Sequence, residues 1–124
     1  MASTVMELDG PRFEELLSTS GKLVIVELFM STCPHCQAVA PIYERLAGEL
    51  GGKAIFARME ALRDRPEAMK GIRAVPTFRY FCKGERVGES VGYRDEASLR
   101  GAIVDTIRQH GDCSQMFTSV PPGG

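Results

Sequence analysis

Two cysteines separated by a proline and a histidine are the residues of this sequence best suited to chemistry. The segment STCPHCQ (Ser31–Gln37) places Cys33 and Cys36 about one turn apart if it opens a helix. At that spacing two Cα atoms approach within the ~4.4–6.8 Å that a disulfide requires. Such a pair can be a redox couple, half of a metal site or a structural staple. The surrounding sequence has to distinguish these three uses.

The position of Cys33 favours the redox use. Cys33 follows an apolar segment and is expected at the N-cap of a helix whose first residue is Pro34. The backbone amides of His35 and Cys36 would then point toward the Cys33 sulfur and, with the positive end of the helix dipole, favour a thiolate. The pKa of Cys33 should therefore fall, with Cys36 held behind it. This arrangement favours thiol–disulfide exchange.

His35 is expected to point outward from the first helical turn. A protonated imidazole there would stabilise the thiolate, and so the reduced dithiol, which makes the disulfide more oxidising. The alternative is an exposed histidine that has no effect on the cysteine pair.

A structural zinc site is disfavoured, because zinc takes four nitrogen or sulfur ligands that usually come in two paired groups. Outside the motif the chain offers only Cys82, His110 and Cys113, and none of them belongs to a second CxxC. We therefore expect neither a metal nor a bound cofactor. Cys82 is expected to be a buried, inert thiol and Cys113 an exposed free thiol, while His110 should interact with the dipole of the last helix.

Alternating strand and helix patterns supply the elements that position the motif. Leu23–Phe29 (LVIVELF) is a nearly continuous apolar run, as expected of a strand buried on both faces. A long helix follows from Cys33–Pro34 to Gly51–Gly52. The order β-α-β-α-β-α-β-β-α predicts an α/β fold, with a central mixed sheet flanked by helices on both faces. The other expected elements are strands at Val5–Leu8, Lys53–Met59, Thr77–Cys82 and Glu85–Val91, a helix after Asp9, a short helix near Pro66–Lys70 and a last helix after Asp95.

Composition indicates one ordinary globular domain. The chain has 124 residues, of which 44% are hydrophobic, and a net charge of −1, so nothing points to nucleic acid or a membrane as a partner. We expect a domain over residues 1–110, a flexible tail over residues 111–124 and a monomeric protein. The start has no basic segment followed by an apolar run, so a cytoplasmic location is expected.

Three features together resemble the thioredoxin family: CPHC after a buried strand, Val75–Pro76–Thr77 before a hairpin, and Pro41 inside the long helix. The likeness runs from Val5 to about His110. It includes GIRAVPTFRYFCKGE (Gly71–Glu85), similar to the family's segment around its cis-proline, and Val91–Gly92, similar to the glycine beside its active site. The resemblance implies a thioredoxin fold and a protein-disulfide oxidoreductase.

By this resemblance Cys33 is the attacking nucleophile, with Pro34 beside it, and Cys36 is the resolving thiol. Pro76 is expected to be a cis-proline packed against the pair, while the Val75 backbone binds an extended substrate segment. By itself, Pro76 could equally be a proline at a strand entry. The substrate surface is expected to be formed by Met30–Pro34, Val75–Pro76 and Gly92–Tyr93, and the residues assigned to it are Thr32, Val75, Pro76, Thr77, Gly92 and Tyr93.

Glu27 is an acid inside the apolar strand, where an unpaired charge costs several kcal/mol. The resemblance places it where thioredoxins have a buried Asp and disulfide isomerases a Glu. Burial should raise its pKa, which suits it to take the proton of Cys36. The alternative is a carboxylate that reaches the surface or pairs with an arginine. Arg58 stands near the position of the family's lysine on the third strand and is a candidate to replace it.

The sequence also departs from the family pattern. It has no tryptophan, and its Pro-His dipeptide is typical of strongly oxidising periplasmic oxidases. Those enzymes carry a helical insertion, for which the segment between Gly51 and Val75 has no room. We expect a reductant of protein disulfides that a reductase re-reduces. A more oxidising oxidase or isomerase, or a thioredoxin-fold interaction module without catalysis, are the alternatives.

Overall fold

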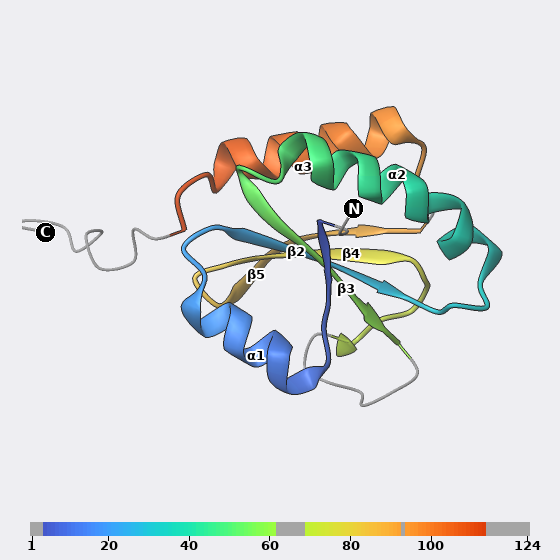
Figure 1. Cartoon of the computed structure of the whole chain (residues 1–124), viewed down its shortest axis with the longest axis horizontal. Helices are drawn as coiled ribbons and strands as arrows, with labels where there is room; N and C mark the ends of the chain where they lie inside the picture. The colour runs from blue at the N-terminus through green and yellow to red at the C-terminus, as the bar shows by residue number, and fades with distance from the viewer. Residues whose placement is uncertain (1–3, 62–68, 93, 114–124) are drawn as a thin grey trace, which may run out of the picture.

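A five-stranded mixed sheet forms the centre of the protein (Figure 1). The computed structural model describes residues 4–61, 69–92 and 94–113. The strand order is β1-β3-β2-β4-β5, with β1 and β2 parallel to β3 and with β4 antiparallel to β2 and β5. Helices α2 and α3 cover one face and α1 covers the other, which confirms the predicted arrangement. The strands are β1 (Val5–Glu7), β2 (Leu23–Phe29), β3 (Ala54–Glu60), β4 (Thr77–Cys82) and β5 (Glu85–Val91), and the helices are α1 (Gly10–Thr19), α2 (Pro34–Leu50) and α3 (Glu96–Gln109).

Strand β2 is the most enclosed element, since all seven of its residues are buried. Side chains alternate between the two faces of a strand. Leu23 and Ile25 accordingly belong to the cluster under α2 and α3, whereas Val24, Val26 and Leu28 pack in the cluster on the α1 side. Glu27, two residues after Ile25, therefore faces the helix that carries the CxxC motif.

The chain between β3 and β4 is only partly described. The short helix predicted near Pro66–Lys70 falls largely within residues 62–68, which lie outside the described residues. The hairpin between β4 and β5 turns at Lys83–Gly84, as predicted. Both turn residues have positive φ, 57° and 82°. Two-residue hairpin loops favour this conformation because it matches the right-handed twist of the flanking strands.

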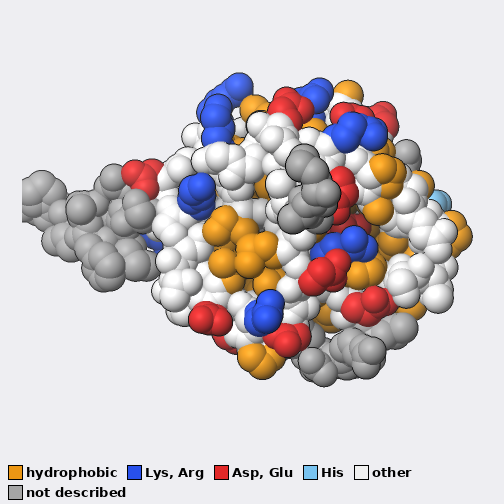
Figure 2. All heavy atoms as spheres, in the orientation of Figure 1, with side chains coloured by type: hydrophobic (Ala, Val, Ile, Leu, Met, Phe, Trp, Pro, Cys, Tyr) orange, Lys and Arg blue, Asp and Glu red, His pale blue; other side chains and the backbone are white. Residues whose placement is uncertain are grey.

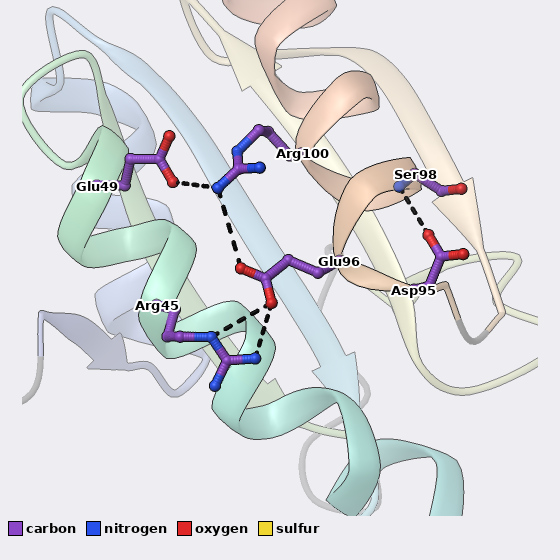
Figure 3. Close-up of polar contacts among 6 residues, drawn as sticks. All are labelled: Arg45, Glu49, Asp95, Glu96, Ser98 and Arg100. Carbon is purple, nitrogen blue, oxygen red and sulfur yellow. Dashed lines mark hydrogen bonds and ion pairs between the residues drawn. The ribbon is translucent and has the colours of Figure 1, made fainter.

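An ion-pair network joins α2 to α3 across the top of the sheet (Figure 3). Glu96 accepts hydrogen bonds from the Arg45 guanidinium, the shorter of 2.8 Å, and lies 3.9 Å from Arg100. Arg100 in turn donates to Glu49 at 2.6 Å. Asp95 caps α3 by accepting from the backbone N–H of Ser98 at 2.8 Å. These pairs are exposed and add little stability, so the buried side chains beneath α2 mainly hold the helix, and the motif at its start, in place.

The visible surface mixes both signs of charge (Figure 2). Apolar side chains gather near the β1 edge, where Met6 is 44% exposed and a shallow groove runs past Ala54, Ile55 and Phe56. Among the described residues, no helix combines the length and the apolar character that crossing a bilayer requires.

Cys82 and Cys113 form a disulfide, which contradicts the predictions of an inert thiol and an exposed free thiol. Their Cα atoms lie 5.3 Å apart although 31 positions separate them in the sequence. Both residues are buried, with exposures of 8% and 1%, in the cluster beneath α2 and α3. After α3 the chain turns back over the end of β4, which brings Cys113 next to Cys82. Neither cysteine lies in a sequence motif that predicts this pairing. The bond ties the chain to the domain as far as residue 113; residues 114–124 lie outside the described part.

Removing this disulfide should weaken the fold. The bond closes a 31-residue separation, so its loss frees conformations of the unfolded chain, and we expect Cys82→Ala/Cys113→Ala to lose about 2 to 5 kcal/mol in free energy of unfolding. Urea denaturation under non-reducing conditions measures the loss. The matched control is Cys33→Ala/Cys36→Ala, whose cysteines are unbonded in this structure. Equal stability of the Cys82/Cys113 variant and the wild type would contradict this role.

Candidate active site at the start of helix α2

The loop before α2 holds Cys33 at the helix N-cap, as the sequence predicts. The Cys33 backbone N–H donates to the Met30 carbonyl at 3.0 Å, which forms a tight turn. The Cys33 carbonyl then accepts from the Gln37 N–H at 3.0 Å and begins the helix. Pro34 is the first helical residue, where its missing N–H costs no hydrogen bond.

Glu60, which the sequence reasoning did not identify, fastens this loop to the sheet. Its carboxylate accepts from the Ser31 N–H at 2.9 Å, while the Gln37 side chain donates to the Ser31 carbonyl at 2.9 Å. Strands β2 and β3 are parallel, so their carboxyl ends meet at one edge of the sheet. An acidic residue at the end of β3 is therefore a sequence feature from which the contact of Glu60 with the loop could have been predicted. The loop geometry is therefore set by β3 as well as by β2.

The two thiols of the motif have opposite environments. Cys33 is partly exposed, and its pKa is lowered because the backbone N–H of Cys36, the Cys36 thiol and the His35 backbone N–H favour the thiolate. Cys36 is 4% exposed, and burial raises its pKa to about 11. The neutral Cys33 thiol makes no capping hydrogen bond, so the amides act on its charged form. One sulfur is thus accessible and activated, and the other is protonated and enclosed.

The Val75–Pro76 segment lies against Cys33. The Val75–Pro76 peptide bond is cis, and the Cys33 Sγ atom is 3.9 Å from the Val75 carbonyl oxygen. The Gly92 N–H donates to the Pro76 carbonyl at 2.8 Å, so the end of β5 adjoins the same segment. Thr77 is buried and donates its hydroxyl to the Ala74 carbonyl at 2.6 Å. Three separate parts of the sequence therefore meet around one sulfur.

Glu27 lies beneath this site with an exposed fraction of 1%. Neither of its carboxylate oxygens has a hydrogen-bond partner among the described residues. Burial raises the pKa of Glu27 to about 7, although the positive charge of Arg58 opposes that rise. The charge of Glu27 also contributes to the raised pKa of Cys36, so the two groups interact. A carboxyl group that titrates near neutrality beside a buried thiol can exchange a proton with it.

Arg58 stands directly opposite Glu27 in the register of β2 and β3. Its guanidinium lies 4.1 Å from the centre of the Phe29 ring and 3.5 Å from the Glu7 carboxylate. Arg58 therefore places a positive charge near Glu27 while its closest ion pair is with Glu7. Its role as a replacement for the family's lysine stays a prediction.

The remaining predicted site residues differ in how the structure places them. His35 and Thr32 are exposed on either side of Cys33, so His35 does point away from the core. Its effect on the thiolate stays a prediction. Tyr93 lies outside the described residues. Within residues 4–61, 69–92 and 94–113, no group of three or more His, Cys, Asp or Glu side chains is arranged to hold a metal ion.

Glu27→Gln should flatten the pH dependence of stability. The pKa of Glu27 is raised from 4.5 to about 7 on folding, so the folded state binds the proton more tightly than the unfolded state. This favourable contribution is present at low pH and is lost as the pH rises through about 7. Between pH 5 and 8, the wild type should lose about 2 to 3 kcal/mol more free energy of unfolding than the variant.

Urea denaturation at both pH values measures this difference. The control is Glu85→Gln, which replaces an exposed glutamate at the start of β5. Parallel pH profiles for the wild type and Glu27→Gln would show that Glu27 does not titrate in this range.

Comparisons with known proteins identify the family and the fold of the chain. The thioredoxin family model matches residues 4–105. The chain is 35% identical over 94 residues to a rice protein named protein disulfide isomerase-like 2-3, covering 75% of this chain and 21% of that protein. It is 34% identical over 90 residues to a protein disulfide-isomerase A6 homolog of Caenorhabditis elegans, covering 72% of this chain and 20% of that protein.

The chain thus spans about a fifth of the length of these two relatives. The crystal structure of a thioredoxin from Malassezia sympodialis superposes with a TM-score of 0.74, at 24% identity, covering 89% of this chain and 93% of that one. That likeness concerns the fold, which the predicted mixed sheet and its flanking helices match. With the family model covering most of its length, the chain belongs to the thioredoxin family.

Proposed function

We propose that this protein is a thiol–disulfide oxidoreductase that exchanges its Cys33–Cys36 pair with disulfides of other proteins. The observation that carries the proposal is the unequal environment of the two thiols. Cys33 is accessible and has a lowered pKa, whereas Cys36 is buried and has a raised one. Only the first is suited to attack an incoming disulfide.

In the first step a substrate segment lies against Val75–Pro76, which adjoins the Cys33 sulfur. The Cys33 thiolate attacks one sulfur of the substrate disulfide. A mixed disulfide forms, and the other substrate sulfur leaves as a thiolate that takes a proton from water.

In the second step Cys36 must lose its proton before it can attack. Glu27 is the proposed acceptor, because its pKa of about 7 leaves a substantial fraction ionised near neutral pH. The Cys36 thiolate then attacks the Cys33 sulfur, closes the Cys33–Cys36 disulfide and releases the second substrate thiolate. Two electrons pass to the substrate, and a disulfide reductase would return them to the protein.

Cys36→Ser should trap substrate as a covalent complex, whereas Cys33→Ser should not. Without Cys36 the mixed disulfide has no internal thiol to resolve it. Incubation with a disulfide-containing protein, followed by non-reducing electrophoresis, detects the adduct. The wild type and the Cys33→Ser/Cys36→Ser double variant serve as controls. Equal trapping by both single variants, or by neither, would contradict the assigned roles.

The direction of exchange depends on the reduction potential of the Cys33–Cys36 pair. We propose a net reductant whose potential lies between the ~−270 mV of thioredoxin and the ~−120 mV of a strongly oxidising periplasmic enzyme. The reason is His35, whose imidazole, when protonated, would stabilise the Cys33 thiolate and with it the reduced form. Equilibration with glutathione measures the potential, with His35→Gln as the variant expected to be more reducing. A wild-type value at or below ~−270 mV would contradict this role of His35.

A more oxidising oxidase or isomerase is the second candidate, supported by relatives that are named protein disulfide isomerases. An interaction module without catalysis would instead retain full biological activity as the Cys33→Ser/Cys36→Ser variant.

The expected cytoplasmic location remains a proposal. The Cys82–Cys113 disulfide weighs against a reducing compartment, because such bonds persist mainly where conditions are oxidising.

A further inference from the structure

A groove with four basic lining residues lies on the α1 side of β4 and β5 and begins at Thr77, the residue after Pro76. It has a volume of about 270 Å³ and continues into a second hollow of about 500 Å³ beside Phe13 and Leu17 of α1. We call the first hollow the basic groove. Its lining residues are Lys70, Gly71, Arg73, Thr77, Arg79, Arg86, Glu89 and Val91.

Among the described residues that line this groove, four are basic and one is acidic, so their positive charge exceeds their negative charge. Arg79 is 3% exposed and donates to the Glu89 carboxylate at 2.8 Å. The same Glu89 oxygen lies 4.0 Å from Arg86, so a single carboxylate is shared between two guanidinium groups. Arg73 is exposed and has no ion pair among the described residues. The groove therefore retains capacity to bind negative charge.

One end of the basic groove adjoins the Val75–Pro76 segment through Arg73 and Thr77, which flank that segment in the sequence. Thr77 follows Pro76 in the chain and pairs with Val91 in the register of β4 and β5. Arg73 precedes Val75 by two residues, and the Val75 carbonyl is 3.9 Å from Cys33 Sγ. An extended polypeptide advances about 3.3 Å per residue. A segment held at Val75 thus reaches the groove within a few residues of its own cysteine.

We propose that the basic groove selects substrate polypeptides that carry acidic residues within a few positions of the disulfide. This inference rests on the proposed function and adds a substrate class to it. Val91, whose side chain is 50% exposed at the groove wall, offers an apolar contact beside the cations. The groove thus fits a peptide with carboxylates next to an apolar residue. Charges at the rim of a binding surface act mainly on association and specificity.

Two matched disulfide-containing peptides test the proposal. They share one sequence, except that the three residues following the reactive cysteine are Glu in one and Gln in the other. The readout is the ratio of kcat/KM values for the two peptides within each protein variant, so a general loss of activity or folding cancels. At low ionic strength we expect the wild type to favour the Glu peptide by about three- to tenfold, and 0.5 M salt to reduce this preference.

Arg73→Gln/Arg86→Gln should bring the ratio close to one, and Arg73→Lys/Arg86→Lys should retain most of the preference. Arg73→Glu/Arg86→Glu should favour a third peptide with Lys at the same positions. The control is Arg108→Gln on α3, which replaces a 77% exposed arginine whose partner Asp105 is in the same helix; its ratio should equal that of the wild type.

Hydroxyethyl disulfide, which is small and uncharged, separates this inference from the proposed function. Turnover of this compound with equal rates for the Glu and Gln peptides would overturn the basic groove as a specificity element. The basic groove would also be overturned if Arg73→Gln/Arg86→Gln left the preference for the Glu peptide intact. It would be overturned as well if Arg108→Gln abolished this preference as fully as Arg73→Gln/Arg86→Gln does. If the wild type reduced neither the Glu peptide, nor the Gln peptide, nor hydroxyethyl disulfide, this result would contradict the proposed function, and this inference with it.

Discussion

The enclosure of β2 is the constraint on which the rest of this structure depends. Every residue of this strand is buried, because β3 and β4 flank it and helices cover both faces. Its direction fixes where the next segment emerges, so Cys33 and α2 begin at the carboxyl edge of the sheet. The same enclosure forces the Glu27 carboxyl group into the interior. A strand whose Glu27 face were solvated could deliver the motif to the same edge, but it would leave this acid with an ordinary pKa.

Position within one helical turn makes two chemically identical side chains behave differently. Cys33 lies outside the first turn, where amide groups point at its sulfur, and Cys36 lies inside the turn, where the sheet covers it. The resulting difference in pKa orders the proposed reaction, because the sulfur that can ionise is also the one that can meet a partner. The loop contacts made by Glu60 and Gln37 hold that geometry without contributing a reacting group.

The sequence was most informative where local pattern and function coincide. The apolar run of β2, the N-cap position of Cys33 and the buried acid Glu27 each follow from residue type and spacing over a few positions. Contacts that join distant segments had weaker local signals, and the approach of Val75–Pro76 to Cys33 was predicted only through the family resemblance. The Cys82–Cys113 bond arises from the path of α3 across the sheet, and the partnership of Arg79 with Glu89 arises from strand register. Glu60 was missed for a similar reason, since its role is visible only once β3 is placed beside β2.

The Cys33/Cys36 pair and the Cys82–Cys113 disulfide lie at opposite ends of the sheet, and this separation affects which of them a reductant can reach. Cys82 ends β4 beside the start of β2, whereas Thr77 at the other end of β4 lies beside the carboxyl end of β2, near Cys33. A reductant that approaches the Thr77 end meets the accessible sulfur of Cys33. At the Cys82 end of β4, both cysteines are buried, which restricts the approach of an external thiolate to their sulfurs. In the proposed reaction, this burial would slow thiol attack on the Cys82–Cys113 bond, so that Cys33–Cys36 could be oxidised and reduced while the second pair stays oxidised.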